Sequence, residues 1–289
     1  MNKRLRADLS LLLVAFIWGS VFVVQRIAAT GLGTFIFNGC RFLIGALALL
    51  PFLKEKIRLE SRQVKWILLA GFFLFSASSF QQAGLYTTTA ANAGFITGAY
   101  VVIIPLIQTI FLKTRLPGFV WVAVLLSMLG IFLLSTGGRL EFNPGDILVL
   151  IGALLWALHV ITVGRAVKDV PLLPFSIGQY AVTSLLSLAL GLILESHTIP
   201  ALVDLGWTVL YGGLLSIAIG YTLQARAQKL APPADTAIIL SMEGVFAALF
   251  GYLWLGERFV PLQWVGSILI LAAMLLVQLK TLQQTQSEH

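Results

Sequence analysis

One carboxylate, Glu243, lies near the middle of a long apolar stretch of the chain, residues 231–261. The stretch opens with a polar turn and continues for about twenty mostly apolar residues before it closes at Gly256 and Glu257. A helix of that length crosses a hydrocarbon layer of ~30 Å, because each residue adds ~1.5 Å. A charged group at that depth costs at least ~2.5 kcal/mol, so it normally faces a helix bundle or a watery cavity. Glu243 is therefore the first candidate for chemistry, either as a proton carrier or as the partner of an amine.

A second stretch, residues 87–117, resembles the first. It ends with the letters LKTR at 112–115, and the first stretch ends with LGER at 255–258, an offset of 258 − 115 = 143 residues. With that offset Tyr100 aligns with Glu243. The sequence thus indicates an internal duplication.

Polar and aromatic side chains at mid-span positions form a candidate binding site with Glu243. The candidate substrate-binding residues are Trp18, Gln81, Gln82, Asn92, Tyr100, Trp156, His159, Tyr221, Gln224 and Glu243. Uncharged amide and hydroxyl groups suit a zwitterionic or polar neutral solute. Structural roles are the alternative, because tryptophans also pack in cores and glutamines also join helices at ~0.6 kcal/mol per hydrogen bond.

Two of these candidates have specific structural alternatives. His159 lies one turn from Trp156 on the same face, so it can relay protons or hydrogen-bond a neighbouring helix. Asn92 lies beside Gly94 and Gly98, a pattern of small residues that also marks close helix packing.

Composition indicates an all-α integral membrane protein. The chain of 289 residues is 58% hydrophobic and 11% charged, with a mean hydropathy of +0.95, whereas soluble domains carry about 25% charge. The alternating pattern of an outer-membrane barrel is absent from the sequence. The net charge of +7 resides in short loops between apolar spans, which is typical of membrane topology and not of a nucleic-acid surface. The single cysteine, Cys40, excludes an internal disulfide and a cysteine metal cluster.

No enzyme motif occurs in the sequence. We find no Gly-x-Ser-x-Gly, His-Glu-x-x-His or phosphate-loop pattern, and the three histidines are too far apart in the sequence to suggest a metal site. We therefore expect no catalytic residue, no metal and no cofactor.

Turn residues and charges divide the chain into ten predicted spans. They cover about 9–28, 34–53, 64–85, 90–112, 118–136, 144–164, 175–194, 206–228, 234–254 and 261–280. With the N-terminus inside, fifteen basic residues face the cytoplasm and three face outward, a strong positive-inside bias. Both termini are therefore expected in the cytoplasm, with a polar, disordered tail at 282–289.

Residues inside the spans repeat as well. At an offset of 138 residues, Trp18 aligns with Trp156 and Arg41 aligns with Gln179. At an offset of 142, Gly71 aligns with Gly213 and Gln82 aligns with Gln224. At an offset of 143, Trp121 aligns with Trp264. Five spans per half is an odd number, so the second half must enter the membrane from the opposite side. The sequence thus predicts inverted repeats over 1–140 and 141–281, with a substrate site at their interface near the membrane midplane.

Two residues have expected structural roles. Arg41, about two turns into its span, is expected to snorkel toward the interface or to pair with a carbonyl group. Pro105 is expected to kink the fourth span.

The double pattern resembles the ten-helix EamA-like family of the drug/metabolite transporter superfamily. The residues that carry the resemblance are Ala15–Ser20, Arg41–Ile44, Asn92–Thr97, Leu255–Arg258 and Gln263–Gly266. The resemblance implies a carrier, often an exporter, of amino acids or other small metabolites, with helices 1, 3, 4, 6, 8 and 9 around a central cavity. Two places depart from the family pattern: Lys113-Thr114-Arg115 stands where Gly-Glu-Arg is frequent, and Gly244 stands where proline is common.

The sequence therefore predicts a multi-pass secondary transporter of an inner membrane. It would move a small-molecule substrate, outward and with coupling to protons, by exposing a midplane cavity to each side in turn. An intramembrane enzyme acting on lipid is the alternative in another class, and a channel or scaffold is a third. The pattern leaves a monomer and a homodimer open, and the lipid bilayer is the one other partner expected.

Overall fold

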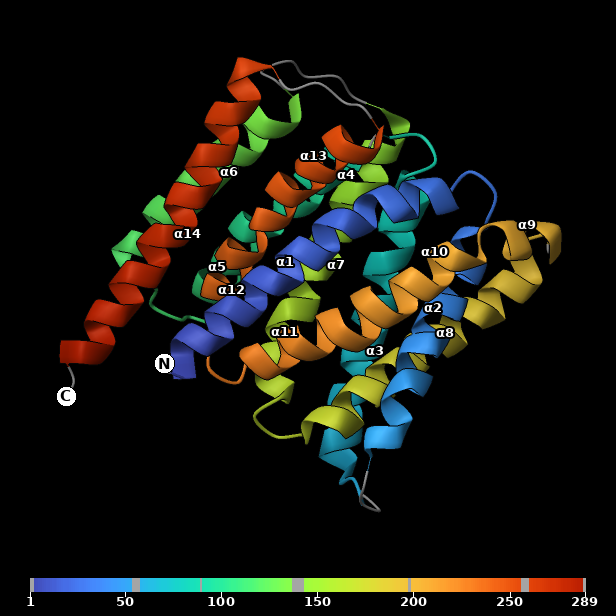
Figure 1. Cartoon of the computed structure of the whole chain (residues 1–289). Helices are drawn as coiled ribbons and strands as arrows, with labels where there is room; N and C mark the ends of the chain where they lie inside the picture. The colour runs from blue at the N-terminus through green and yellow to red at the C-terminus, as the bar shows by residue number, and fades with distance from the viewer. Residues whose placement is uncertain are drawn as a thin grey trace.

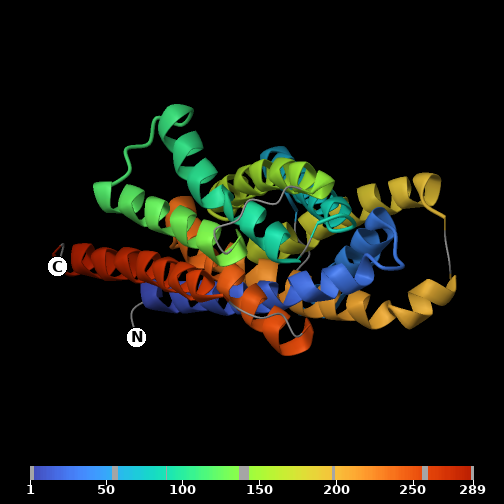
Figure 2. The same cartoon turned by 90° about the horizontal axis from the view of Figure 1, so that it is seen from above.

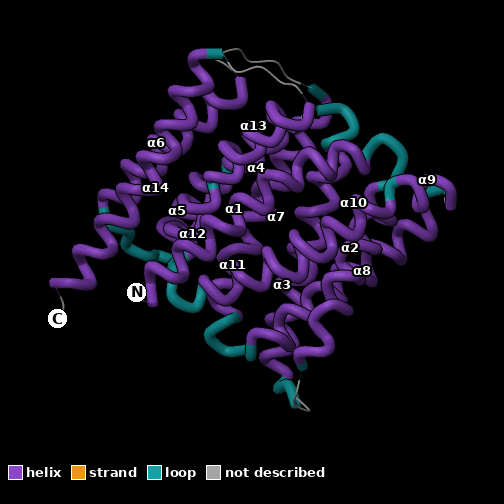
Figure 3. The backbone as a smooth tube through the Cα atoms, in the orientation of Figure 1, coloured by secondary structure: helices purple, strands orange, loops and turns teal. Residues whose placement is uncertain are grey.

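The computed structural model describes residues 3–53, 58–88, 90–136, 143–196, 199–255 and 260–287, and all regular structure in these ranges is helical (Figure 3). In chain order the helices are α1 (Lys3–Ala28), α2 (Thr34–Leu49), η1 (Leu50–Phe52), α3 (Ser61–Gly84), α4 (Ala90–Gly98), α5 (Tyr100–Ile110), α6 (Gly118–Thr136), α7 (Pro144–Ala166), α8 (Leu172–Leu194), α9 (Ile199–Asp204), α10 (Gly206–Tyr211), η2 (Gly212–Tyr221), α11 (Thr222–Ala227), α12 (Pro233–Leu240), α13 (Met242–Leu255) and α14 (Pro261–Ser287). The prediction of an all-α fold is confirmed.

Long apolar helices dominate the described chain. Seven helical segments are long and apolar enough to cross a membrane, and three more apolar helices are shorter, at Ile96–Ile110, Gly118–Leu134 and Pro261–Val277. Large apolar side chains on the outer surface are exposed, for example Leu125 at 66% and Ile193 at 77%. Such a surface is unfavourable in water and suited to lipid, so the chain is an integral membrane protein.

The helices pack in pairs that are distant in sequence. α3 lies against α7, α2 against α8, α1 against α13, and α6 against α14. Figure 1 shows α6 and α14 side by side at one edge of the molecule and α2 with α8 at the opposite edge, and Figure 2 gives the view from above. One large apolar core, with Phe42, Ile104 and Tyr180 among its buried members, fills the space between the helices.

Two of the predicted spans are interrupted, each near its middle. The fourth divides into α4 and α5 at Ala99, and the ninth divides into α12 and α13 at Ser241. Ser241 donates its hydroxyl to the carbonyl of Ile238 at 2.7 Å, a local bond that competes with the helix ladder. Pro105, where a kink is expected, lies inside α5, and the interruption lies six residues earlier, at Ala99. The ninth span is interrupted in the same way with no proline near, so proline is not the cause.

The eighth span also differs from a regular α-helix. Its central ten residues, Gly212–Tyr221, form a π-helix, whose wider turns are frequent at functional sites. The segment packs against α1 and α2.

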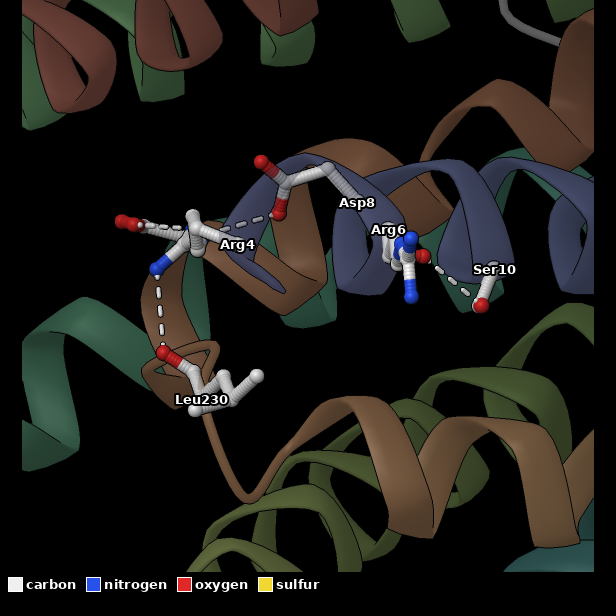
Figure 4. A network of polar contacts seen from close by, with 6 residues as sticks. Arg4, Arg6, Asp8, Ser10 and Leu230 are labelled. Atoms are coloured by element: carbon white, nitrogen blue, oxygen red, sulfur yellow. Dashed lines mark hydrogen bonds and ion pairs between the residues drawn. The ribbon is translucent and has the colours of Figure 1, made fainter. Parts of the chain in front are cut away.

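Polar contacts join helix ends on both sides of the bundle. On one side Arg26 donates to the carbonyl of Leu85, and Glu195 accepts the backbone N–H groups of Phe35 and Ile36 at 2.8 Å each. On the other side Arg4 of α1 reaches the carbonyl of Leu230 at 3.2 Å (Figure 4). These contacts hold the described helix ends together at both faces.

A close helix contact at Gly213 gives the first testable prediction. A Cβ atom on Gly213 would lie 2.9 Å from the carbonyl oxygen of Arg41 and 2.7 Å from Ile44, whereas one on Gly206, at the start of the same span, would meet nothing within 4 Å. We expect Gly213→Ala to lower the stability of the purified protein by about 1–3 kcal/mol, because the helices must separate. Gly206→Ala is the matched control. Equal melting temperatures for the two variants would contradict the packing described.

Candidate functional site

A small cavity lies in the centre of the helix bundle, with a volume of about 40 Å³. It brings together eight of the ten residues predicted from the sequence: Trp18, Gln81, Tyr100, Trp156, His159, Tyr221, Gln224 and Glu243. A water molecule needs ~10–15 Å³ by this measure, so the space holds a few waters and not a metabolite. Passage of a solute therefore requires the helices to move.

Glu243 and Tyr100 meet directly in this cavity. The Tyr100 hydroxyl donates to Glu243 Oε1 at 2.8 Å, and the two side chains are only 4% exposed. Both residues directly follow the helix interruptions, Tyr100 as the first residue of α5 and Glu243 as the second of α13. Among the described residues Glu243 forms no ion pair, so a neutral phenol is its hydrogen-bond partner within the protein.

Aromatic rings surround Tyr221 at one wall of the cavity. The centroids of Trp18 and Trp156 lie 4.6 and 5.9 Å from that of Tyr221, and the Trp156 ring is stacked at an interplanar angle of 15°. Trp156 Nε1 donates to Gln81 Oε1 at 2.8 Å, and Trp18 Nε1 donates to the carbonyl of Ser216 in the π-helix at 3.4 Å. The indole N–H groups thus have partners, and the ring faces remain to contact apolar parts of a ligand.

Two polar side chains of the lining keep atoms that are unpaired within the described chain. His159 Nε2 bonds Gln179 Oε1 of α8 at 3.0 Å, and its Nδ1 has no partner. Gln224 Nε2 donates to Gln228 at 3.1 Å, and its Oε1 has no partner. A buried polar atom without a partner costs free energy, so these two atoms are suited to receive a polar solute.

Gln82, another of the predicted residues, does not line the cavity. Gln82 is fully buried and donates to the backbone carbonyl of Gln25 at 3.2 Å, which is the helix-joining alternative. The backbone of Asn92 belongs to α4, and its side chain lies outside the described part of the structure.

Arg41 lines the cavity, although the sequence suggested a structural role. The expectation that it snorkels was wrong, because the side chain is 2% exposed. Its Nε donates to Asn38 Oδ1 at 3.0 Å, and its guanidinium carbon lies 4.9 Å from the ring centroid of Phe37. If the Gln25 amide is turned over, its oxygen lies 3.1 Å from Arg41 Nη1. The signal that could have found this role is the charge itself, since ionisable residues within spans are rarely structural alone.

The arrangement suits recognition of a small solute with two opposite charges. Glu243 can accept hydrogen bonds from an ammonium group, and the Arg41 guanidinium can bind a carboxylate. Among the described residues no group of three or more histidine, cysteine, aspartate or glutamate side chains could hold a metal ion.

Comparison with protein families gives two matches along this one chain. The model of the EamA-like transporter family matches residues 5–136 and again residues 143–279. The chain belongs to the EamA-like transporter family. This family is part of the drug/metabolite transporter superfamily, so the resemblance in the sequence is confirmed and the protein is a membrane transporter of that type.

Several relatives are named as transporters. The chain is 36% identical to an uncharacterized transporter of Archaeoglobus fulgidus, over 96% of this chain and 87% of the relative. It is 28% identical to the uncharacterized inner membrane transporter YedA of Escherichia coli, over 91% and 87% of the two chains. It is 27% identical to the threonine/homoserine exporter RhtA of Escherichia coli, over 81% and 78%.

A solved structure shares the fold of this family member. A protein crystal structure superposes with a TM-score of 0.80, covering 96% of this chain and 98% of that chain, at 17% sequence identity. That likeness concerns the fold alone.

Proposed function

We propose that this EamA-like transporter exports small zwitterionic metabolites of the amino-acid class from the cytoplasm across an inner membrane. The observation that carries the proposal is the placement of one buried carboxylate, Glu243, and one buried guanidinium, Arg41, on the same central cavity. A zwitterion neutralises both groups at once, whereas a simple amine or a simple acid leaves one of them unpaired. The similarity to a threonine/homoserine exporter supports the same class of solute.

Contacts between repeat positions support two equivalent halves, residues 1–140 and 141–281. Tyr100 and Glu243, which align at the offset of 143, hydrogen-bond each other. Two copies of one object can touch through the same position only near the axis that relates them. The pair thus supports a pseudo-two-fold axis through the cavity, and the two family matches divide the chain at the same place.

Glycine contacts support the same relation away from the axis. A Cβ on Gly71 would lie 2.6 Å from Val182 and 3.1 Å from the Gln179 carbonyl. The corresponding distances for Gly213 are 2.7 Å to the nearest atom of Ile44 and 2.9 Å to the Arg41 carbonyl. Each of these residues is the repeat mate of its counterpart, at offsets of 142 or 138.

The directions of the first helices support an inverted relation. Arg26, in the last turn of α1, bonds the carbonyl of Leu85, and nearby Thr88 bonds Asp146 in the first turn of α7. The end of α1 and the start of α7 therefore lie on the same side of the bundle. Because α7 is the repeat mate of α1, the mates run in opposite directions, as ten spans in inverted halves require.

Alternating access follows from this arrangement. The cavity is too small for a metabolite and polar contacts join helix ends on both faces, so a solute enters only when one face opens. Two similar halves can open each face by related movements.

We further propose that protons drive the export. A buried carboxylate without a cationic partner is stable only when it is neutralised, either by a proton or by the ammonium group of the solute. Glu243 can hold one of these at a time, so loading of solute on the cytoplasmic side releases a proton there. When the empty site returns to the cytoplasmic side with a proton bound to Glu243, the complete cycle exchanges solute for protons.

Orientation in the membrane gives the second testable prediction. Both termini are proposed to be cytoplasmic, and Figure 1 shows them near each other at one edge of the bundle. In a Cys40→Ser background, we expect a membrane-impermeant maleimide to label Asp204→Cys in intact cells and Arg58→Cys only after the cells are opened; both positions are exposed. Labelling with the reverse pattern would overturn the orientation.

The proposed function is tested by transport into liposomes. Purified protein should exchange a labelled amino acid for protons. The rate of amino-acid transport should rise when a pH gradient drives protons in the opposite direction. An enzyme acting on lipid would instead change the chemical structure of the lipid. An open channel would give a solute flux that does not saturate at high solute concentration. The oligomeric state stays a prediction of a monomer or a homodimer.

A further inference from the structure

A second and larger hollow lies on the surface, apart from the central cavity. It has a volume of about 560 Å³ and lies between the first turns of α1 and the end of α11. None of its lining residues belongs to the central cavity. Its wall combines three basic residues, Lys3, Arg6 and Arg226, with three leucines, Leu9, Leu13 and Leu230. We call it the basic groove.

The positive charge of the basic groove is uncompensated among the described residues. Lys3, Arg6 and Arg226 are exposed, none takes part in an ion pair there, and no acidic residue lines the groove. They come from two segments more than 200 residues apart in the chain, so the fold, and not one basic run, gathers them.

Within the described chain, Arg4, which neighbours the basic groove, forms ion pairs, unlike the three basic residues of the groove. It donates to Asp8 at 2.9 Å and to Asp235 at 2.8 Å, and these two carboxylates are nearly buried. Figure 4 shows Arg4 turned toward Asp8 and Leu230. These two carboxylates are thus paired with Arg4, and neither of them lines the basic groove.

Leu9 and Leu13 extend the groove along α1 beyond Lys3 and Arg6, and Leu230 adds apolar surface at the charged end, where its carbonyl accepts from Arg4. Leu9, Leu13 and Leu230 are 44%, 49% and 51% exposed. Arg6 and Leu13 are seven residues apart and lie on one face of α1. From Lys3 to Leu13 the helix advances ~15 Å, which is about one leaflet of a hydrocarbon layer of ~30 Å.

We propose that the basic groove binds one anionic glycerophospholipid from the leaflet on the side of the N-terminus. Its headgroup phosphate would contact Lys3, Arg6 and Arg226, and an acyl chain would lie along Leu9 and Leu13. Basic pockets beside membrane helices attract anionic headgroups. A soluble phosphate would leave the leucines uncovered. A lipid whose headgroup carries an ammonium group would place a fourth positive charge beside the three basic residues, which is unfavourable.

The test titrates lipid into the purified full-length protein in neutral detergent, with bound lipid counted by native mass spectrometry. We expect phosphatidylglycerol to bind at one site, and the variant Lys3→Gln/Arg6→Gln/Arg226→Gln to bind it about 100-fold more weakly. Ser10→Trp fills the groove without changing the charge and should also block binding. The matched control, Arg58→Gln/Lys65→Gln/Lys168→Gln, removes equal charge from exposed positions outside the groove and should bind as the wild type does.

Each other result counts against the site. Equal losses in the two triple variants would show general attraction by charge, and equal binding of phosphatidylcholine would remove the role of the headgroup. Displacement of the lipid by an equal concentration of glycerophosphate would point to a soluble anion. Unchanged melting temperatures and elution volumes of the variants keep a folding defect separate from a binding defect.

Discussion

Replacing Glu243 with glutamine is expected to abolish the response of transport to a pH gradient. Glutamine keeps the size of the side chain and can still accept the Tyr100 hydroxyl, which lies 2.8 Å from Glu243 Oε1. It cannot release a proton or carry a negative charge. Hydrogen bonds to charged groups contribute ~1.5–3 kcal/mol, so affinity for a zwitterion should fall roughly 10- to 100-fold.

The measurement compares purified wild-type protein and the Glu243→Gln variant in liposomes, with and without an imposed pH gradient. Asp204→Asn is the matched control, because Asp204 is an exposed carboxylate outside the cavity. A Glu243→Gln variant with the wild-type rate and the wild-type gradient response would make Glu243 structural, and the proton-carrying role would then pass to His159.

Replacing Arg41 with glutamine is expected to remove the preference for solutes that carry a carboxylate. The guanidinium lines the cavity and is buried, so its loss leaves a carboxylate without a charged partner in a site of low polarity. We expect affinity for a zwitterion to fall roughly 10- to 100-fold and affinity for a solute without a carboxylate to change little. Arg41→Lys should recover part of the loss, since a lysine keeps the charge but not the two-pronged geometry.

In the proposed repeat, glutamine occupies the position of the second half that corresponds to Arg41. Gln179, the repeat mate of Arg41, is fully buried in the second half. The Arg41→Gln variant should therefore fold, and its binding of an amine without a carboxylate shows whether the cavity is intact. Equal losses for solutes with and without a carboxylate would assign Arg41 to the fold and not to recognition.

Much of the candidate site could be predicted because burying polar groups in lipid is costly. A carboxylate in an apolar run of about twenty residues has few stable places besides a cavity, which identified Glu243. The repeat then identified Tyr100, which carries no such signal by itself. The neighbours Gln81 and Gln82 could not be told apart, since successive helix residues point ~100° apart and the sequence does not say which face meets the cavity.

Other features could not be predicted from the sequence. Alanine is the strongest helix former, so Ala99 itself does not indicate the interruption, and Gly98 before it was interpreted as part of a close helix contact. Arg41 lies near enough to a span end for snorkelling to be reasonable, and only packing against α8 and η2 decides that it points inward. The π-helix of Gly212–Tyr221 packs against α1 and α2, and these contacts could not be predicted from its sequence.

The central claim is that a zwitterion, and nothing simpler, exchanges for protons through the cavity between the two halves. It is tested most directly by proton flux in liposomes that contain the purified protein and a trapped pH indicator. Amino acids, the amines that lack their carboxylate and the acids that lack their amine are added in turn to the same vesicles. Proton flux with amino acids alone, lost in Glu243→Gln and in Arg41→Gln, is the predicted result. Equal flux with all three classes of solute, or flux that survives in both variants, would contradict the claim.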